Sequence, residues 1–166
     1  MTVVSDASPL ISLAAIGRLD LLRQLFGTIS IPAYVHKEVT QATGRAGAKE
    51  LAASDWVAVL KLGNEFLARA LEGELDRGEA EAIALAVELK ADLVLIDERR
   101  GRAVAARFGL KVVGVLGLLI EAKRQGLLDR IEPLLSDLLH KAGFRLGPEL
   151  YRRILEEAGE APSLQV

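Results

Sequence analysis

The sequence predicts a three-layer α/β fold with a mostly parallel, twisted sheet of about five strands, helices on both faces and a helical C-terminal extension. Two observations support this prediction. Short runs rich in β-branched residues or leucine alternate along the chain with segments of helical periodicity. These runs are almost continuously apolar, as in residues 93–96, which is typical of strands covered on both faces.

The predicted elements alternate through the first two thirds of the chain. The strands are expected at residues 2–5, 28–31, 56–60, 93–96 and 111–115. Between them, helices are expected at residues 9–15, 19–25, from Pro32 onward, 46–53, 65–72 and 78–90. Pro32 suits the first turn of a helix, because proline lacks the amide that this turn leaves unbonded. Residues 116–125, 127–141 and 148–158 should form the helical extension, and residues 44–48 a flexible loop.

Length and composition limit the possible classes of protein. The 166 residues suit one domain, expected over residues 1–158, with residues 159–166 a frayed tail. The absence of cysteine excludes disulfides and thiolate metal sites. No run approaches the roughly 20 apolar residues that span a bilayer, and no secretory pattern opens the chain. We therefore expect a cytoplasmic protein with no membrane contact.

The overall charge is slightly negative. The 21 basic and 23 acidic residues give a formal net charge of −2, without the positive field typical of constitutive nucleic-acid binders. Binding of nucleic acid would therefore need a local basic patch. Arg99, Arg100 and Arg102 directly follow Asp97 and are candidates, although a solvated basic face explains them equally well.

Two aspartates follow predicted strands. In open α/β sheets, ligands bind at the carboxyl ends of the strands, so Asp6 and Asp97 are placed to line a crevice there. The alternative for each residue is an ordinary helix N-cap, in which the carboxylate accepts a hydrogen bond from a free backbone amide.

Two glutamates are further candidates. On its predicted helix, Glu79 falls between Ile83 and Ala86 and should point inward, whereas Glu81 lies roughly 200° away and should face water. A buried carboxylate implies a cation, a hydrogen-bond network or a raised pKa, although the helix dipole also favours an acid at this end. Glu38 lies beside an apolar stripe and, taken alone, is typical of a surface residue.

Other chemistries lack their usual patterns. The chain has no glycine-rich dinucleotide or phosphate-loop motif, and its serines near Asp6 form no nucleophile elbow. His36 and His140 have no partner at zinc-ligand spacing, so both are expected to be non-catalytic.

Several segments together resemble a PIN domain, most of all a prokaryotic subfamily similar to the VapC toxins. They are residues 5–11, 31–39, 78–82, 95–101 and 143–145. The resemblance implies a metal-dependent ribonuclease that hydrolyses RNA phosphodiester bonds. Many such proteins act as toxins in toxin–antitoxin pairs, so it also implies an antitoxin protein and a homodimer as partners.

The resemblance also implies roles for particular residues. The acids that match those holding Mg²⁺ or Mn²⁺ and performing catalysis are Asp6, Glu38, Glu79 and Asp97. Ser8 matches a polar position beside the first acid, and Arg99, Arg100 and Arg102 would hold the RNA backbone. Two positions depart from the toxins, since Glu79 replaces the more frequent aspartate and Leu95 replaces a serine or threonine.

Alternatives to a nuclease stay open at this point. Leu95 and the net charge favour a catalytically inactive PIN-like module that binds protein or RNA. A phosphotransfer receiver domain also places aspartates at strand ends, but no partner lysine follows the last predicted strand. The apolar residues of the extension could pack on the core or form a dimer interface; they are Leu127, Leu128, Ile131, Leu134, Leu135, Leu138 and Leu139.

Overall fold

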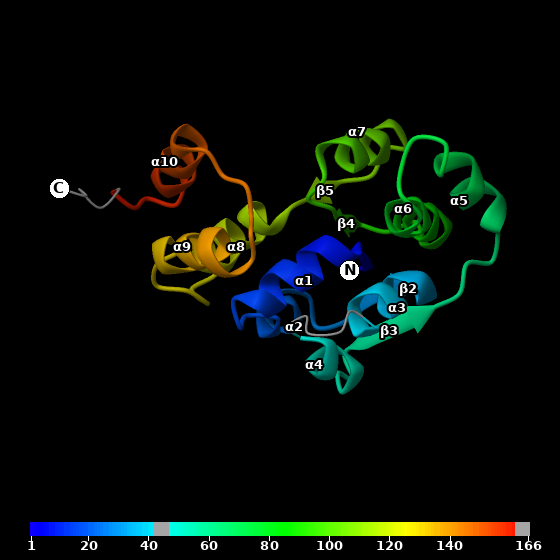
Figure 1. Ribbon diagram of the computed structural model, residues 1–166, viewed down its shortest axis with the longest axis horizontal. Helices are drawn as coiled ribbons and strands as arrows, with labels where there is room; N and C mark the ends of the chain where they lie inside the picture. The colour runs from blue at the N-terminus through cyan, green and yellow to red at the C-terminus, as the bar shows by residue number, and fades with distance from the viewer. Residues whose placement is uncertain (42–46, 162–166) are drawn as a thin grey trace.

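The computed structural model describes residues 1–41 and 47–161 and contains one parallel sheet (Figure 1). Its five strands lie in the order β3-β2-β1-β4-β5, and every neighbouring pair is parallel. The strands are β1 (Val3–Ser5), β2 (Ile29–Pro32), β3 (Val57–Leu60), β4 (Leu93–Leu95) and β5 (Val112–Val113). The predicted α/β fold class is therefore confirmed.

Ten helices connect and follow the strands within the described ranges. They are α1 (Ala7–Ala15), α2 (Asp20–Phe26), α3 (Ala33–Gln41), α4 (Ala48–Ala52), α5 (Glu65–Leu71), α6 (Arg77–Leu89), α7 (Arg99–Arg107), α8 (Val115–Arg124), α9 (Glu132–Lys141) and α10 (Pro148–Glu157). Pro32 was predicted to open a helix but is the last residue of β2, paired in register with Leu60. A strand tolerates proline at its end, where the missing amide costs little.

Helix α7 was not predicted from the sequence. Its only buried residues are Gly101, Val104 and Ala105, so its apolar stripe is short and its arginines dominate the pattern. A helix at this place is nevertheless what the topology requires, because β4 and β5 are parallel and need a crossover between them.

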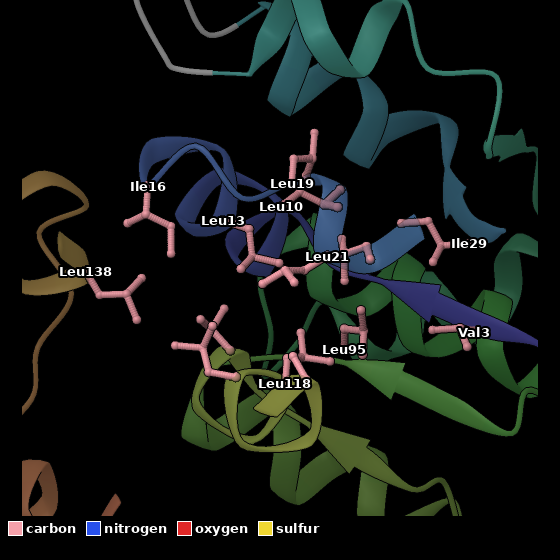
Figure 2. Packing of buried hydrophobic residues seen from close by; sticks show 14 of the residues in the cluster. Val3, Leu10, Leu13, Ile16, Leu19, Leu21, Ile29, Leu95, Leu118 and Leu138 are labelled. Carbon is pink, nitrogen blue, oxygen red and sulfur yellow. The ribbon is translucent and has the colours of Figure 1, made fainter. Parts of the chain in front are cut away.

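Two hydrophobic cores lie on opposite faces of the sheet. Successive side chains of a strand alternate between faces, so Val3 and Leu95 face one core while Val4 and Val94 face the other. The first core packs against α1, α2 and the C-terminal helices, and Figure 2 shows Leu118 of α8 close to Leu95. The second core packs against α6 and α7. These layers hold the ends of β1 and β4 rigidly between helices.

The C-terminal helices pack on the first core. The buried residues of this part include Leu128, Ile131, Leu135 and Leu138, so the packing interpretation of the apolar extension is confirmed for them. Helix α9 begins at Glu132 instead of residue 127, with a proline in its first turn. None of the helices in residues 1–41 and 47–161 has the length and apolar character needed to cross a membrane.

Glu160 anchors the end of the described chain. Its buried carboxylate accepts hydrogen bonds from the backbone amides of Ile131 (2.7 Å) and Glu132 (3.2 Å) and pairs with Lys123 Nζ (3.0 Å). The expectation of a frayed tail from Gly159 is therefore wrong at Glu160, because this carboxylate binds the start of α9. Residues 162–166 of that tail, and residues 44–46 of the expected flexible loop, lie outside the described residues.

Candidate acidic site at the carboxyl edge of the sheet

The strand order reverses between β1 and β4. From β1 the chain continues to β2 and β3 on one side, and then crosses to β4 and β5 on the other. Such a switch point is where open α/β sheets bind ligands. Asp6 directly follows β1, and its amide donates a hydrogen bond to the carbonyl of Leu95 in β4 (3.0 Å). Asp97 follows the same strand two residues later, so both aspartates lie at this edge.

The first turn of α6 brings three acids together. Asp6 and Glu79 are buried, with only 4% and 5% of their surfaces exposed. Gly78 lies against the carboxylates of Glu38 and Asp6. A Cβ atom at Gly78 would collide with Glu38 Oε1 and lie 3.4 Å from Asp6 Oδ1. Glycine at this position therefore leaves room for Glu38 beside Asp6. The structure places Glu38, which alone looked like a surface residue, in the same cluster.

The proximity of these acids changes their protonation. Burial raises the pKa of Asp6 to about 7, and the negative charges of Asp76, Glu79 and Glu38 add to this, against a backbone hydrogen bond at Ala7. Burial likewise raises the pKa of Glu79 to about 7, helped by nearby acids that again include Asp76 and Glu38. The cause in both cases is that a desolvated carboxylate among like charges favours its protonated form.

Asp97 has a structural role on the β4 side. Its Oδ1 accepts a hydrogen bond from the amide of Val115 (2.8 Å) at the start of α8, whose N-cap residue is Gly114. A Cβ at Gly114 would lie only 2.8 Å from that oxygen. The N-cap alternative is thus partly correct, but the helix that Asp97 caps is α8 and not the one that follows it in sequence.

The second oxygen of Asp97 is differently placed. Asp97 Oδ2 is buried and has no hydrogen-bond partner among residues 1–41 and 47–161. Burial raises the pKa of Asp97, while the Val115 amide and the positive charge of Arg102 oppose that shift. Asp97 is not among the leading causes of the raised pKa of Asp6 or of Glu79. In the described part of the chain, no three acids are already oriented around one point as metal ligands.

Asp76 also lies at the candidate site, although it was not among the site residues predicted from the sequence. Its Oδ1 accepts a hydrogen bond from the Glu79 amide (2.8 Å), which caps α6. Its charge also raises the pKa of both Asp6 and Glu79. The order Asp76-Arg77-Gly78-Glu79, a capping residue followed three places later by glutamate before an apolar run, is a signal that could have found it.

Glu81 departs from its expected position. Its side chain is only 15% exposed and lies 3.5 Å from the guanidinium of Arg77, so the prediction that it faces water is wrong. Helical periodicity separated Glu79 from Glu81 correctly, but α5 packs beside α6 and covers part of the outer face. Only the inward position of Glu79 follows from the helix alone.

The expected RNA-binding residues lie around the same edge. Ser8 is half-buried in the first turn of α1, and Arg99, Arg100 and Arg102 are exposed in the first half of α7. Arg102 is close enough to Asp97 to lower its pKa. Leu95 is fully buried in the first core, so its replacement of a polar residue is accommodated by packing.

Comparison with known protein families identifies the family of this fold. A family model described as PIN domain matches residues 2–160. The chain belongs to the PIN domain family. PIN domains have a nuclease-type fold and are generally nucleases that typically use divalent metal ions. The search of curated proteins returned no match to this PIN domain.

The acids of this PIN domain suit such an ion chemically. Mg²⁺ and Mn²⁺ prefer oxygen ligands, and the cluster at the switch point offers only carboxylates. Asp6 and Glu79 are buried beside other acids, and Asp97 Oδ2 is a buried acceptor to which no described residue donates. A cation would favour the charged form of these carboxylates and so offset the burial and the like charges that raise their pKa values. The side chains therefore fit a hard divalent cation.

Proposed function

We propose that this PIN domain is a hydrolase that cleaves RNA phosphodiester bonds with the help of Mg²⁺ or Mn²⁺. The observation that carries the proposal is the burial of Asp6 and Glu79 beside Glu38 at the switch point of the sheet. Burying several like charges without a cation costs several kcal/mol in principle, which a protein avoids unless the arrangement serves a purpose.

In this proposal, the metal ligands come from both sides of the switch point between β1 and β4. Asp6, Glu38 and Glu79 would hold the cation from the β1 side, and Asp97 would contribute its Oδ2 from the β4 side. When bound, such an ion polarises a phosphoryl oxygen and neutralises charge that develops during hydrolysis. Asp76 would position Glu79 through its hydrogen bond to the Glu79 amide.

The same proposal assigns substrate contacts to the rim. Ser8 lies two residues from Asp6, and the exposed side chains of Arg99 and Arg100 make no hydrogen bond or ion pair with the residues that the structure describes. Their charges remain available to backbone phosphates. Arg102, beside Asp97, would hold the strand next to the metal.

A cleavage assay tests the proposal. Purified protein is incubated with mixed RNAs and Mn²⁺, alongside Asp6→Asn, Asp97→Asn and the control Asp129→Asn, which changes an exposed aspartate after α8. We expect cleavage by the wild type and the control, and its loss in the two site variants while their circular dichroism stays native. Cleavage that survives in both site variants would refute the assignment.

The biological setting proposed is that of a toxin. In that case an antitoxin protein would bind the domain, and the domain would associate as a homodimer in the cytoplasm. Expression in a bacterial host should then arrest growth, and Asp6→Asn should relieve the arrest. Growth unaffected by the wild-type protein at a level confirmed by immunoblot would argue against the toxin role without touching the nuclease chemistry.

A catalytically inactive binding module is the second candidate. Its support is that Leu95 is fully buried in the core where similar toxins carry a polar residue, and that the described acids are not oriented as a ready set of ligands. Calorimetric titration with Mn²⁺ separates the two candidates. Metal binding without cleavage of any RNA tested would favour the module.

A further inference from the structure

A polar cavity lies on the side of β2 and β3, at the start of α6. It has a volume of about 400 Å³ and is formed by the first turns of α3 and α6 and by the residues that follow β3. Its polar lining includes Tyr34, Lys37, Lys61 and Arg77, and we call it the basic groove. None of these four residues is among the acids of the candidate site.

The basic groove carries positive charge that its own acids do not neutralise. Glu65 and Glu81 also line it, but Glu65 pairs with Arg69 (3.2 Å) and Glu81 with Arg77 (3.5 Å). Lys37 and Lys61 are exposed, and neither forms an ion pair with another residue of the described ranges. Two lysines therefore line the same cavity without an ion-pair partner among the described residues, in a protein whose net charge is −2.

Arg77 lines this groove and contacts an aromatic ring. Its guanidinium lies 4.2 Å from the centre of the Tyr34 ring, a cation–π contact that adds to its pairing with Glu81. A planar guanidinium has several donors that match phosphate oxygens, and the Arg77 side chain is 58% exposed, so it is accessible to an anion in the groove.

The basic groove and the acidic site share two helices. Tyr34 and Glu38 are four residues apart and lie on the same face of α3, about 6 Å apart along its axis at 1.5 Å per residue. On α6, Arg77 directly precedes Gly78, the residue packed against Glu38 and Asp6. A strand bound in the groove would therefore continue directly into the acidic site.

We propose that the basic groove binds the phosphodiester backbone of the RNA strand next to the bond that is cleaved. The ligand class rests on the proposed nuclease function, whereas the groove itself rests on charge and geometry. Lys37, Lys61 and Arg77 contact the phosphates, and Tyr34 provides an aromatic surface typical of single-strand sites. The arginines of α7 lie on the opposite, β4 side, so the strand is held on both flanks of the acids.

The test is a binding measurement without divalent metal. Fluorescence anisotropy with a labelled single-stranded oligoribonucleotide, in EDTA and at several salt concentrations, compares the wild type with Lys37→Ala and Lys61→Ala. Lys111→Ala is the matched control, because this exposed lysine precedes β5 and lies at the opposite edge of the sheet. Competition by inorganic phosphate and by a mononucleotide separates recognition of a polymer from recognition of a free anion.

We expect each groove variant to bind the RNA roughly three- to tenfold more weakly and to lower the salt slope by about 0.7, the value for one lost phosphate contact on a single strand. Lys111→Ala should match the wild type. Unchanged affinity in both groove variants, an equal loss in the control, or no RNA binding by the wild type would overturn the proposal. Stronger competition by phosphate than by the polymer would do the same.

The result of the binding measurement does not depend on whether the protein cleaves RNA. Failure of the nuclease proposal appears as an absence of products with Mn²⁺, whereas failure of the groove appears in EDTA as unaltered binding by the variants. Where cleavage occurs, Lys61→Ala should raise KM and leave kcat near the wild-type value, because Lys61 contacts the flanking strand and not the reacting phosphate.

Discussion

At the scale of single residues, Asp97 contributes both a hydrogen bond and a charge, and substitution can separate them. Asp97→Asn keeps an oxygen that accepts from the Val115 amide, so the free energy of unfolding should stay close to that of the wild type. Asp97→Ala removes the cap of α8 and should lower that free energy by about 1–2 kcal/mol. Urea denaturation of the three proteins measures the difference. An equal decrease in the free energy of unfolding of Asp97→Asn and Asp97→Ala would contradict this separation of the hydrogen bond from the charge.

The buried acids predict a pH dependence for the metal-free protein. Because the pKa of Asp6 and that of Glu79 are raised to about 7 in the folded state, the fold binds more protons than the unfolded chain between about pH 4 and pH 7. The free energy of unfolding should therefore fall as the pH rises through this window, by roughly 2–4 kcal/mol.

Denaturation in EDTA at pH 5 and at pH 8 measures this effect. Asp6→Asn should flatten the dependence and should be more stable than the wild type at pH 8, since an amide carries no buried charge. A wild type that is equally stable at both values would show that the carboxylates are solvated or paired in the metal-free protein.

At the scale of elements, the first turn of α6 leaves room for the acids because Gly78 has no side chain. Gly78→Ala should hardly change stability, because alanine favours a helix by up to about 1 kcal/mol and the atom it meets, Glu38 Oε1, is at the end of a flexible side chain. Displacing Glu38 should nevertheless weaken Mn²⁺ binding about tenfold or more, measured by calorimetry. Gly147→Ala, with open space around its Cβ, is the control.

Elements also show how far local sequence patterns reach. All five strands fall at predicted places, because continuous apolar runs between turns leave few other solutions. Helix α7 was not predicted, because only Gly101, Val104 and Ala105 face the core. The arginines between them leave too few apolar residues to show helical periodicity. The prediction for Glu81 was wrong because α5 packs over that side of α6, and the periodicity of one helix does not predict such a neighbour.

At the scale of the whole molecule, metal binding should stabilise the fold. A ligand present at 100 times its Kd adds about 2.7 kcal/mol to the free energy of unfolding, which for a domain of this size raises Tm by roughly 5–10 °C. Differential scanning fluorimetry with Mn²⁺ should show this rise in the wild type and its loss in Asp6→Asn. No shift at millimolar Mn²⁺ would exclude the proposed site, whatever the result of the RNA assays.

The sequence was sufficient for the order of the strands and of the helices other than α7, for Asp6 and Asp97 at strand ends and for the inward side of Glu79, because each follows from periodicity within one or two elements. The tertiary structure alone decided that Glu38 joins them, and that Asp97 caps α8 instead of its own following helix. Those relations join residues far apart in the chain, and they depend on the strand order and on the close approach of Gly78 to Glu38 and Asp6.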